Sequence, residues 1–174
     1  DNKHRWLAQL DFENHKLLPF EYQYDEAWIG GPGISGWNEE PGNVGFINKS
    51  NVCYFQSEAT GFSHLYTYNF DTKERKAFTS GNFEIHEAYP NHLGTHFYIS
   101  SNKSHAGNRS FYSLEIKTRK WTDLLVEDGK YDVVLSSDEK QLFYTYSFIN
   151  KPTNTTLWEC SQIYNIDTHK SRLD

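Results

Sequence analysis

Residues 131–146 of this chain read YDVVLSSDEKQLFYTY. The runs Tyr131–Leu135 and Leu142–Tyr146 are rich in the β-branched, aromatic and aliphatic side chains that strands prefer. The polar segment Ser136–Lys140 between them is typical of a turn. The stretch therefore predicts two consecutive strands joined by a short turn.

The same arrangement recurs along the chain at a fixed spacing. Tyr66, Tyr112 and Trp158 each close a pair of large apolar residues, and these three positions are 46 residues apart. Similar polar turns follow them at residues 71–75, 117–120 and 167–170. Four short strands per unit at a period of about 40–50 residues are the signature of a β-propeller. We therefore expect an all-β fold, a partial β-propeller of about three and a half blades, each a four-stranded antiparallel sheet.

The N-terminal segment fits this repeat only in part. Residues 5–12 and 17–20 look like the last two strands of a blade whose first two strands are missing. Because a propeller protects its sheet edges by closing a ring, we expect the chain to be a piece of a larger propeller. The lack of Met also predicts a start after a processing or cloning boundary. The expected division is a half blade at 1–22, a Gly/Pro-rich inserted loop at 23–43, and blades at 44–80, 81–128 and 129–174.

Composition excludes several classes of protein. Aromatic residues make up 17% of the 174 positions, which is incompatible with a disordered chain because such side chains need burial. The net charge of −6 and the absence of a long basic cluster argue against a nucleic-acid partner. No apolar run approaches the roughly 20 residues of a membrane span, and from the polar first residues we expect no signal peptide in this form of the chain.

Two cysteines are present, Cys53 and Cys160. Cys53 falls on the second strand of the first complete unit. Cys160 falls on the expected third strand of the last unit, Leu157–Tyr164, ahead of a fourth strand that should start near Ser171. Strands two blades apart lie farther from each other than the roughly 7 Å that a disulfide tolerates. We therefore predict no disulfide and two buried free thiols.

Several longer segments resemble one known family. Residues 57–66 read SEATGFSHLY and resemble a Ser-Glu-x-x-Gly-aromatic-x-His-Leu-Tyr segment of dipeptidyl peptidase IV-like enzymes, which belong to the prolyl oligopeptidase clan. Four other segments resemble motifs of the same family in the family's order: residues 1–6, 78–85, 97–102 and 135–140. The resemblance covers the later blades of the family's N-terminal propeller and none of its α/β-hydrolase domain.

The resemblance implies a parent protein that is a serine exopeptidase removing N-terminal dipeptides, often with Pro or Ala second. In such an enzyme a Ser nucleophile, a His base and an orienting Asp perform acyl transfer. The nucleophile needs a Gly-x-Ser-x-Gly turn, whereas the nearest run, residues 31–36 (GPGISG), lacks the second Gly at the required offset. We therefore expect no catalytic residue here. The expected role is to wall the substrate cavity and restrict substrate size.

The resemblance to dipeptidyl peptidase IV-like enzymes also implies the partners and the location of the protein. These partners are the missing hydrolase domain and the remaining blades of the parent, with a peptide as substrate and no cofactor. We expect a periplasmic or secreted protein, and four Asn-x-Ser/Thr sequons are consistent with export. Because the segment leaves two sheet edges open, it could also form oligomers through them.

The segment 25–42 departs from the repeat and carries Trp28 and Trp37 in a Gly/Pro-rich context. Loops carry function more often than the scaffold does, and in the related peptidases loops of this blade are implied to border the cavity. We expect Trp28 and Trp37 to form a substrate-side loop. The neighbouring pair Glu39-Glu40 lies in a turn-rich context, unlike the helical insert that holds the family's substrate-gripping pair, so we interpret it as solvated.

Histidines 86, 92 and 96 are close in sequence, as zinc ligands often are. His92 and His96 fall across a turn between two strands rather than on one helical face. We therefore predict no metal site.

Two alternatives stay open. A stand-alone periplasmic propeller-like binding or scaffold module would keep the fold without a peptidase, and a reading frame that ends after further blades would identify it. A carbohydrate-binding domain would place its aromatic rings on one exposed surface. The rings recur instead at matching strand positions, which favours packing between blades.

Overall fold

The structure, a computed structural model, describes residues 3–34 and 42–159. These residues form strands joined by turns and loops, with no helix among them, so the all-β prediction is confirmed. The described ranges therefore also contain no helix long and apolar enough to cross a bilayer. The strands are β1 (His4–Asp11), β2 (Lys16–Tyr24), β3 (Val44–Phe46), β4 (Val52–Ser57), β5 (His64–Asn69), β6 (Glu74–Ala77), β7 (Ile85–Pro90), β8 (His96–Ser101), β9 (Ser110–Glu115), β10 (Trp121–Leu125), β11 (Lys130–Leu135), β12 (Gln141–Phe148) and β13 (Lys151–Glu159).

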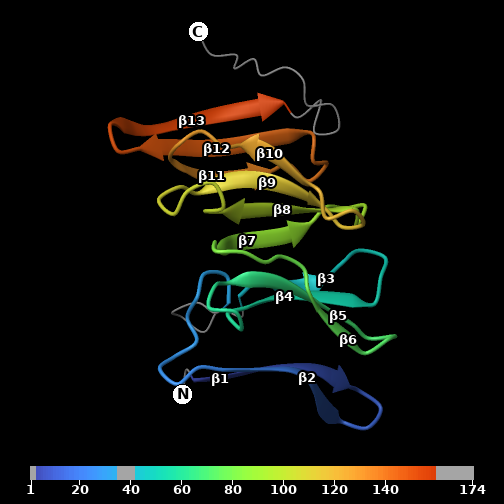
Figure 1. Ribbon diagram of the computed structural model, residues 1–174. Coiled ribbons are helices and arrows are strands. Elements are labelled where there is room, and N and C mark those ends of the chain that lie inside the picture. The colour runs from blue at the N-terminus through green and yellow to red at the C-terminus, as the bar shows by residue number, and fades with distance from the viewer. Residues whose placement is uncertain (1–2, 35–41, 160–174) are drawn as a thin grey trace.

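The strands form antiparallel sheets in which each strand pairs with its neighbour in sequence. We call them the first sheet (β1, β2), the second (β3–β6), the third (β7–β10) and the fourth (β11–β13). Figure 1 shows the sheets stacked face to face in chain order. The repeat predicted from the 46-residue spacing is thus one sheet per unit.

Turns between the strands use a residue in the left-handed region of the backbone. Lys73, Arg119 and Glu139 have φ values of 57°, 62° and 57°, and each lies in one of the predicted polar turns. In the turn before β6, the side chain of Asn69 accepts hydrogen bonds from the backbone N–H groups of Asp71 and Thr72. Polar residues at these positions therefore both reverse the chain and satisfy its backbone donors.

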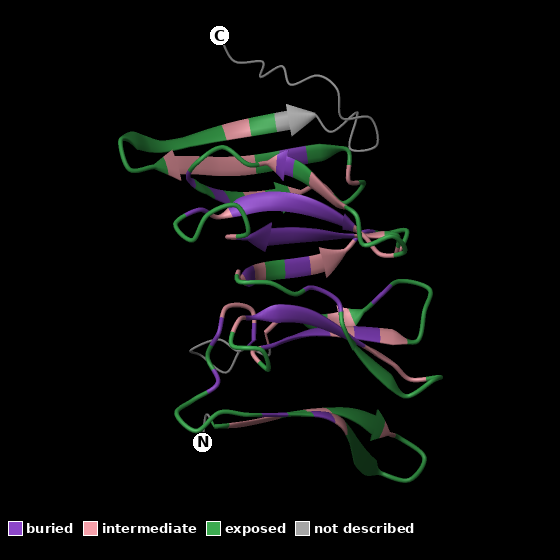
Figure 2. Cartoon of the chain, in the orientation of Figure 1, coloured by how far each residue is buried: buried purple, intermediate pink, exposed green. Residues whose placement is uncertain are grey.

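The second and third sheets bury apolar side chains against each other. One buried cluster contains residues from both sides of this interface. Leu65 lies on the second sheet and Phe78 directly follows its last strand, whereas Phe97, Ile99 and Leu114 lie on the third sheet. The ring centroids of Phe78 and Phe97 lie 5.2 Å apart in an edge-to-face arrangement. This layer is the main core of the described residues, and Figure 2 shows the buried strands concentrated in these two sheets and their interface.

A second cluster lies between the third and fourth sheets. Tyr98, Phe111 and Leu124 pack there against Leu142, and none is more than 4% exposed. The rings of Tyr98 and Phe111 are stacked with centroids 6.0 Å apart. Packing between blades thus accounts for these aromatic positions of the repeat.

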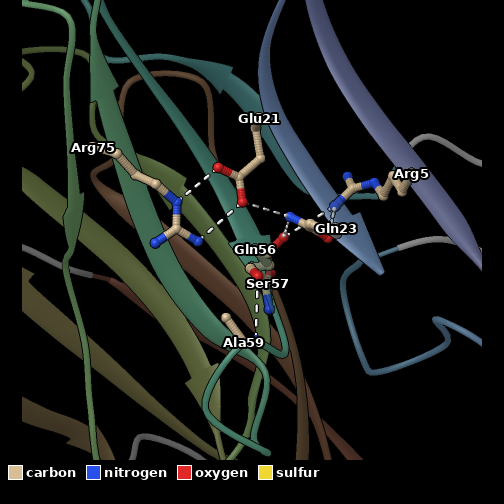
Figure 3. A network of polar contacts seen from close by, with 7 residues as sticks. All are labelled: Arg5, Glu21, Gln23, Gln56, Ser57, Ala59 and Arg75. Atoms are coloured by element: carbon tan, nitrogen blue, oxygen red, sulfur yellow. Dashed lines mark hydrogen bonds and ion pairs between the residues drawn. The ribbon is translucent and has the colours of Figure 1, made fainter. Parts of the chain in front are cut away.

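The interface between the first and second sheets is partly polar. Glu21 is 7% exposed and accepts two hydrogen bonds from the Arg75 guanidinium, from Nε at 2.7 Å and from Nη2 at 3.0 Å (Figure 3). Arg75 also lies over the Tyr66 ring, with 4.2 Å between the guanidinium carbon and the ring centroid. Beside this pair, the Phe20 ring lies 4.9 Å from the Tyr68 ring. A two-pronged ion pair and aromatic contacts therefore hold the first sheet.

The two outermost sheet faces are apolar but exposed. On the fourth sheet, Val134 pairs with Phe143 and Phe143 pairs with Leu157, and the three side chains are 64%, 43% and 59% exposed. On the first sheet, the rings of Trp6 and Tyr22 lie 5.3 Å apart on the face turned away from the stack. Both faces resemble the buried interfaces inside the stack in composition, but no other sheet of the described residues covers them.

The structure corrects the position of one predicted strand. The third strand of the last unit was expected at Leu157–Tyr164, but β13 begins at Lys151 because residues 149–150 turn the chain back immediately after β12. The three threonines among residues 153–156 are β-branched and suit this extended conformation. β2 likewise continues to Tyr24, two residues into the expected loop. Cys160 and the strand expected near Ser171 lie outside the described residues.

Cys53 lies on β4 as predicted, and it is a buried free thiol. Burial raises the pKa of the Cys53 thiol to about 11. The thiolate is the reactive form of cysteine, so we expect the Cys53 thiol to react slowly with electrophiles while the sheet is intact.

We predict that Arg75→Ala lowers the free energy of unfolding by about 2 kcal/mol, because it leaves the buried Glu21 carboxylate without its partner. Urea denaturation would measure the change. Lys76→Ala is the matched control, since Lys76 pairs with Glu74 on the same strand but both side chains are more than half exposed. Such an exposed pair contributes at most about 1 kcal/mol. Equal effects of the two substitutions would contradict this account of the interface.

We also predict that iodoacetamide at pH 8 leaves Cys53 unmodified in the folded protein. With a pKa of about 11, only about 0.1% of the thiol is ionised at that pH. Peptide mapping by mass spectrometry would separate Cys53 from Cys160. Modification of Cys53 should become fast only in urea, and fast alkylation without denaturant would show that the thiol is accessible.

Candidate functional site

The long connection between β2 and β3 lies at one end of the strands. β4, β8 and β12 finish at this end, and β5, β7, β9 and β11 begin there. We call it the loop end, and it lies on the left in Figure 1. Because a rigid scaffold that presents a long loop is the usual setting of a binding site, the loop end is the candidate site.

The connection starts with a fixed turn that presents Trp28. The carboxylate of Asp25 accepts hydrogen bonds from the backbone N–H groups of Ala27 at 2.7 Å and Trp28 at 3.1 Å. The Trp28 side chain is 70% exposed. A methyl group on Gly30 would lie only 3.1 Å from Trp28 Cδ1, so glycine leaves room for the indole beside the backbone. The loop therefore offers a large aromatic surface from a backbone that is tied down.

The next part of the loop is anchored by one buried side chain, Gln56 of β4. Its amide nitrogen donates to the carbonyl oxygens of Pro32 at 3.1 Å and Ile85 at 2.6 Å, and to the Ser63 hydroxyl at 2.9 Å. Its amide oxygen accepts a hydrogen bond from the Asn43 amide. Gln56 is fully buried, so these bonds replace water completely. One amide thus joins both ends of the loop to the start of β7.

The backbone of Gln56 extends the same network to the first sheet. Its carbonyl oxygen accepts hydrogen bonds from Arg5 Nη1 at 3.0 Å and from Gln23 Nε2 at 3.1 Å (Figure 3). Arg5 Nη1 also donates to the Gln23 side chain at 3.2 Å. The three sheets and the loop therefore share polar contacts at this one residue.

The structure describes only part of the predicted substrate-side loop. Trp28 lies at the loop end as an exposed side chain. Trp37 and the pair Glu39-Glu40 lie outside the described residues, and their predicted roles stay predictions. Residues 31–34 form the turn that Gln56 anchors, in agreement with their interpretation as a Gly-rich loop.

The histidines are not gathered at one place. His86 lies at the loop end, at the start of β7, whereas His92 and His96 flank the turn at the far end of that strand. Among the described residues, no three His, Cys, Asp or Glu side chains are grouped as metal ligands.

A surface hollow beside Arg119 lies at the far end of the strands and has a volume of about 200 Å³. This volume is smaller than the roughly 300–1,000 Å³ of typical ligand pockets.

Sequence reasoning missed Gln56 and a charged group around His86. A lone Gln in a β-prone run gives no local signal, because its side-chain partners lie 7 to 29 positions away. His86 is close to Arg109 and Lys130, and burial followed by these two positive charges lowers the pKa of its imidazole to about 4. His86 therefore stays neutral at physiological pH.

Comparison with solved structures identifies the architecture. A crystal structure of Porphyromonas gingivalis dipeptidyl peptidase 4 matches with a TM-score of 0.73 and 18% sequence identity, covering 91% of this chain and 21% of that chain. A crystal structure of a putative dipeptidyl aminopeptidase IV from Bacteroides ovatus matches with a TM-score of 0.67 and 15% identity, covering 91% of this chain and 24% of the other. The chain is therefore a partial β-propeller with antiparallel blades, as predicted.

Sequence comparison then identifies the family. The profile described as "Dipeptidyl peptidase IV (DPP IV) N-terminal region" matches residues 25–153. The dipeptidyl peptidase 4 of the fungus Arthroderma otae is 27% identical over 123 residues, which are 68% of this chain and 14% of that protein. The chain belongs to the family of DPP IV N-terminal regions, and it spans about a seventh of the length of this relative.

We predict that Gln56→Leu lowers the free energy of unfolding by about 2–4 kcal/mol, because it leaves the buried carbonyl groups of Pro32 and Ile85 without a donor. Amide hydrogen exchange should become faster at Ile34 and Asn43, whose N–H groups donate to the carbonyl oxygens of Gly31 and Gly33 in the anchored loop. The control is Gln141→Leu, at an exposed position of β12, which we expect to change stability by less than about 0.5 kcal/mol. Unchanged exchange in the loop would show that Gln56 does not anchor it.

Proposed function

We propose that this chain is a non-catalytic propeller segment of a dipeptidyl peptidase IV-like serine exopeptidase, in which it walls the substrate cavity and limits which peptides enter. The main support for this proposal is the loop end of the chain, which belongs to the family of DPP IV N-terminal regions. There an anchored loop presents the exposed Trp28 side chain. A tryptophan held in place loses little entropy on binding and offers a large surface for stacking on a peptide side chain.

Catalysis belongs to other parts of the parent protein in this proposal. Residues 31–36 lack the second Gly of the Gly-x-Ser-x-Gly elbow that presents a nucleophilic Ser, and the described residues 31–34 form a turn anchored by Gln56. The Ser, His and Asp would lie in a hydrolase domain that covers the loop end. The segment contributes the shape of the cavity, and the parent protein would act outside the cytoplasm, in the periplasm or after secretion.

The outermost faces support neighbouring blades as partners. The exposed row Val134–Phe143–Leu157 and the neighbouring rings of Trp6 and Tyr22 have the composition of the interfaces inside the stack. Burying such faces is favourable by roughly 25 cal/mol per Å² of apolar area. Blades of the parent chain would therefore cover both faces, and the isolated segment would associate through them or through its open edges.

We predict that Trp28→Ala in the full-length enzyme lowers kcat/KM on dipeptide chromogenic substrates by about tenfold, because a lost stacking contact in a dry site is worth roughly 1.4 kcal/mol. Leu93→Ala is the matched control, since Leu93 is 60% exposed but lies in the turn at the far end of β7. An unchanged kcat/KM for Trp28→Ala would remove Trp28 from the substrate side.

Assays of the isolated chain test whether this segment has peptidase activity of its own. It should not hydrolyse the same substrates at any concentration. Turnover by the isolated chain that a serine-directed inhibitor abolishes would overturn the non-catalytic assignment. A full-length protein without a hydrolase domain or peptidase activity would favour the stand-alone module instead.

A further inference from the structure

His86 occupies a β-bulge at the loop end. Ile85 pairs with Ser101 and Glu87 pairs with Ser100, so His86 is an extra residue on β7 with no partner of its own on β8. Its carbonyl oxygen accepts a hydrogen bond from the Asn43 amide at 3.3 Å, which links the bulge to the Gln56 network. Bulges redirect a side chain away from the regular pleat and are common beside binding sites.

Arg109 faces the same bulge from a rigid backbone. Its N–H donates to the Gly129 carbonyl and its own carbonyl accepts from the Tyr131 N–H, both at 2.9 Å. These bonds join the start of β9 to the start of β11 across two sheets. The Arg109 guanidinium then reaches His86 Nδ1 at 3.4 Å and Asp132 at 3.6 Å.

The positive charges in this group outnumber the negative one. Asp132 is the carboxylate paired with both cations, at 2.8 Å from Lys130 Nζ and 3.6 Å from Arg109 Nη1. Its contact with Arg109 is single and long, unlike the two short bonds of the Glu21–Arg75 pair. The side chains of Arg109, Lys130 and Asp132 are 34%, 49% and 54% exposed, so the guanidinium keeps donors that face solvent.

His86 adds a neutral donor to this group. Burial and the charges of Arg109 and Lys130 lower its pKa to about 4, so the ring is uncharged at neutral pH. Because Arg109 can only donate, Nδ1 of His86 accepts, and the ring proton therefore sits on Nε2. The group thus combines one guanidinium, one ammonium and one imidazole N–H, and Asp132 is the carboxylate that pairs with both cations.

We propose that Arg109, Lys130 and His86 form a subsite for a carboxylate group of a peptide in the substrate cavity. The chemistry fits a single carboxylate, because a guanidinium can bind it with two parallel bonds and because Arg109 and Lys130 share one carboxylate partner, Asp132. The subsite lies at the same end of the strands as Trp28. This inference rests on the proposed function, which places a peptide at the loop end.

The test measures peptide binding to the full-length protein by fluorescence anisotropy. The first probe is a labelled Gly-Ala-Asp-Ala-Gly peptide, blocked by acetylation and amidation, and the second has Asn in place of Asp. A third probe has Asn in the centre and a free C-terminal carboxylate. We expect the Asp peptide to bind about tenfold more tightly than the Asn peptide, which is the value of one charge-assisted contact. Tighter binding of only the third probe would assign the subsite to the peptide C-terminus.

Variants separate the subsite from a structural role. Arg109→Gln should abolish the preference for the carboxylate, whereas Arg119→Gln, at the far end of the third sheet, should keep it. Asp132→Asn should increase the preference, because it removes the competing carboxylate, and a merely structural ion pair would not produce such a gain. If Arg109→Gln does not fold, the variants Lys130→Gln and Asp132→Asn still test whether the carboxylate preference depends on this group.

Two outcomes separate this inference from the function on which it rests. Equal binding of the Asp and Asn peptides by a protein that hydrolyses dipeptide substrates would overturn the carboxylate subsite alone. A carboxylate preference that depends on Arg109 in a protein without peptidase activity would overturn the proposed function and retain the site.

Discussion

Burial of each sheet face against the next sheet is the constraint on which this structure depends. A sheet of three or four short strands has two apolar faces and cannot cover either by itself. The second and third sheets meet this constraint with a continuous layer of aliphatic and aromatic side chains. The first and fourth sheets meet it on one face only, and their other faces carry Trp6, Tyr22, Val134 and Phe143 in contact with solvent.

Stacking also decides where functional groups can be placed. The strands run across the stack, so every loop lies at one of two ends, and one long connection reaches the loop end. There, a buried amide at Gln56 replaces the apolar packing used elsewhere, which holds a polar loop without leaving donors or acceptors unsatisfied. The described part of the loop is therefore held by paired polar groups around Gln56 and Asp25, and it presents Trp28 from an anchored backbone.

Much of the fold could be predicted from the sequence because the repeat is local and periodic. Tyr66 and Tyr112, the polar turns and the β-prone runs lie close enough in sequence to define strands and their order. Contacts between sheets could not be predicted in the same way. Glu21 and Arg75 are 54 residues apart, and no pattern around either residue indicates the other. The sequence pattern also does not indicate the β-bulge at His86, because one extra residue does not change the spacing between the predicted strands. The start of β13 at Lys151 was missed because a two-residue turn leaves little polar sequence to mark it.

The interface between the first and second sheets differs in chemistry from the two apolar interfaces, and this difference suggests an order of assembly. The middle interface joins neighbours in sequence through apolar contacts, which tolerate imperfect alignment while a chain collapses. The first interface needs a guanidinium and a carboxylate in one geometry, so it gains stability only once both sheets are already formed. We therefore expect the second and third sheets to fold first and the first sheet to be the part that opens most readily.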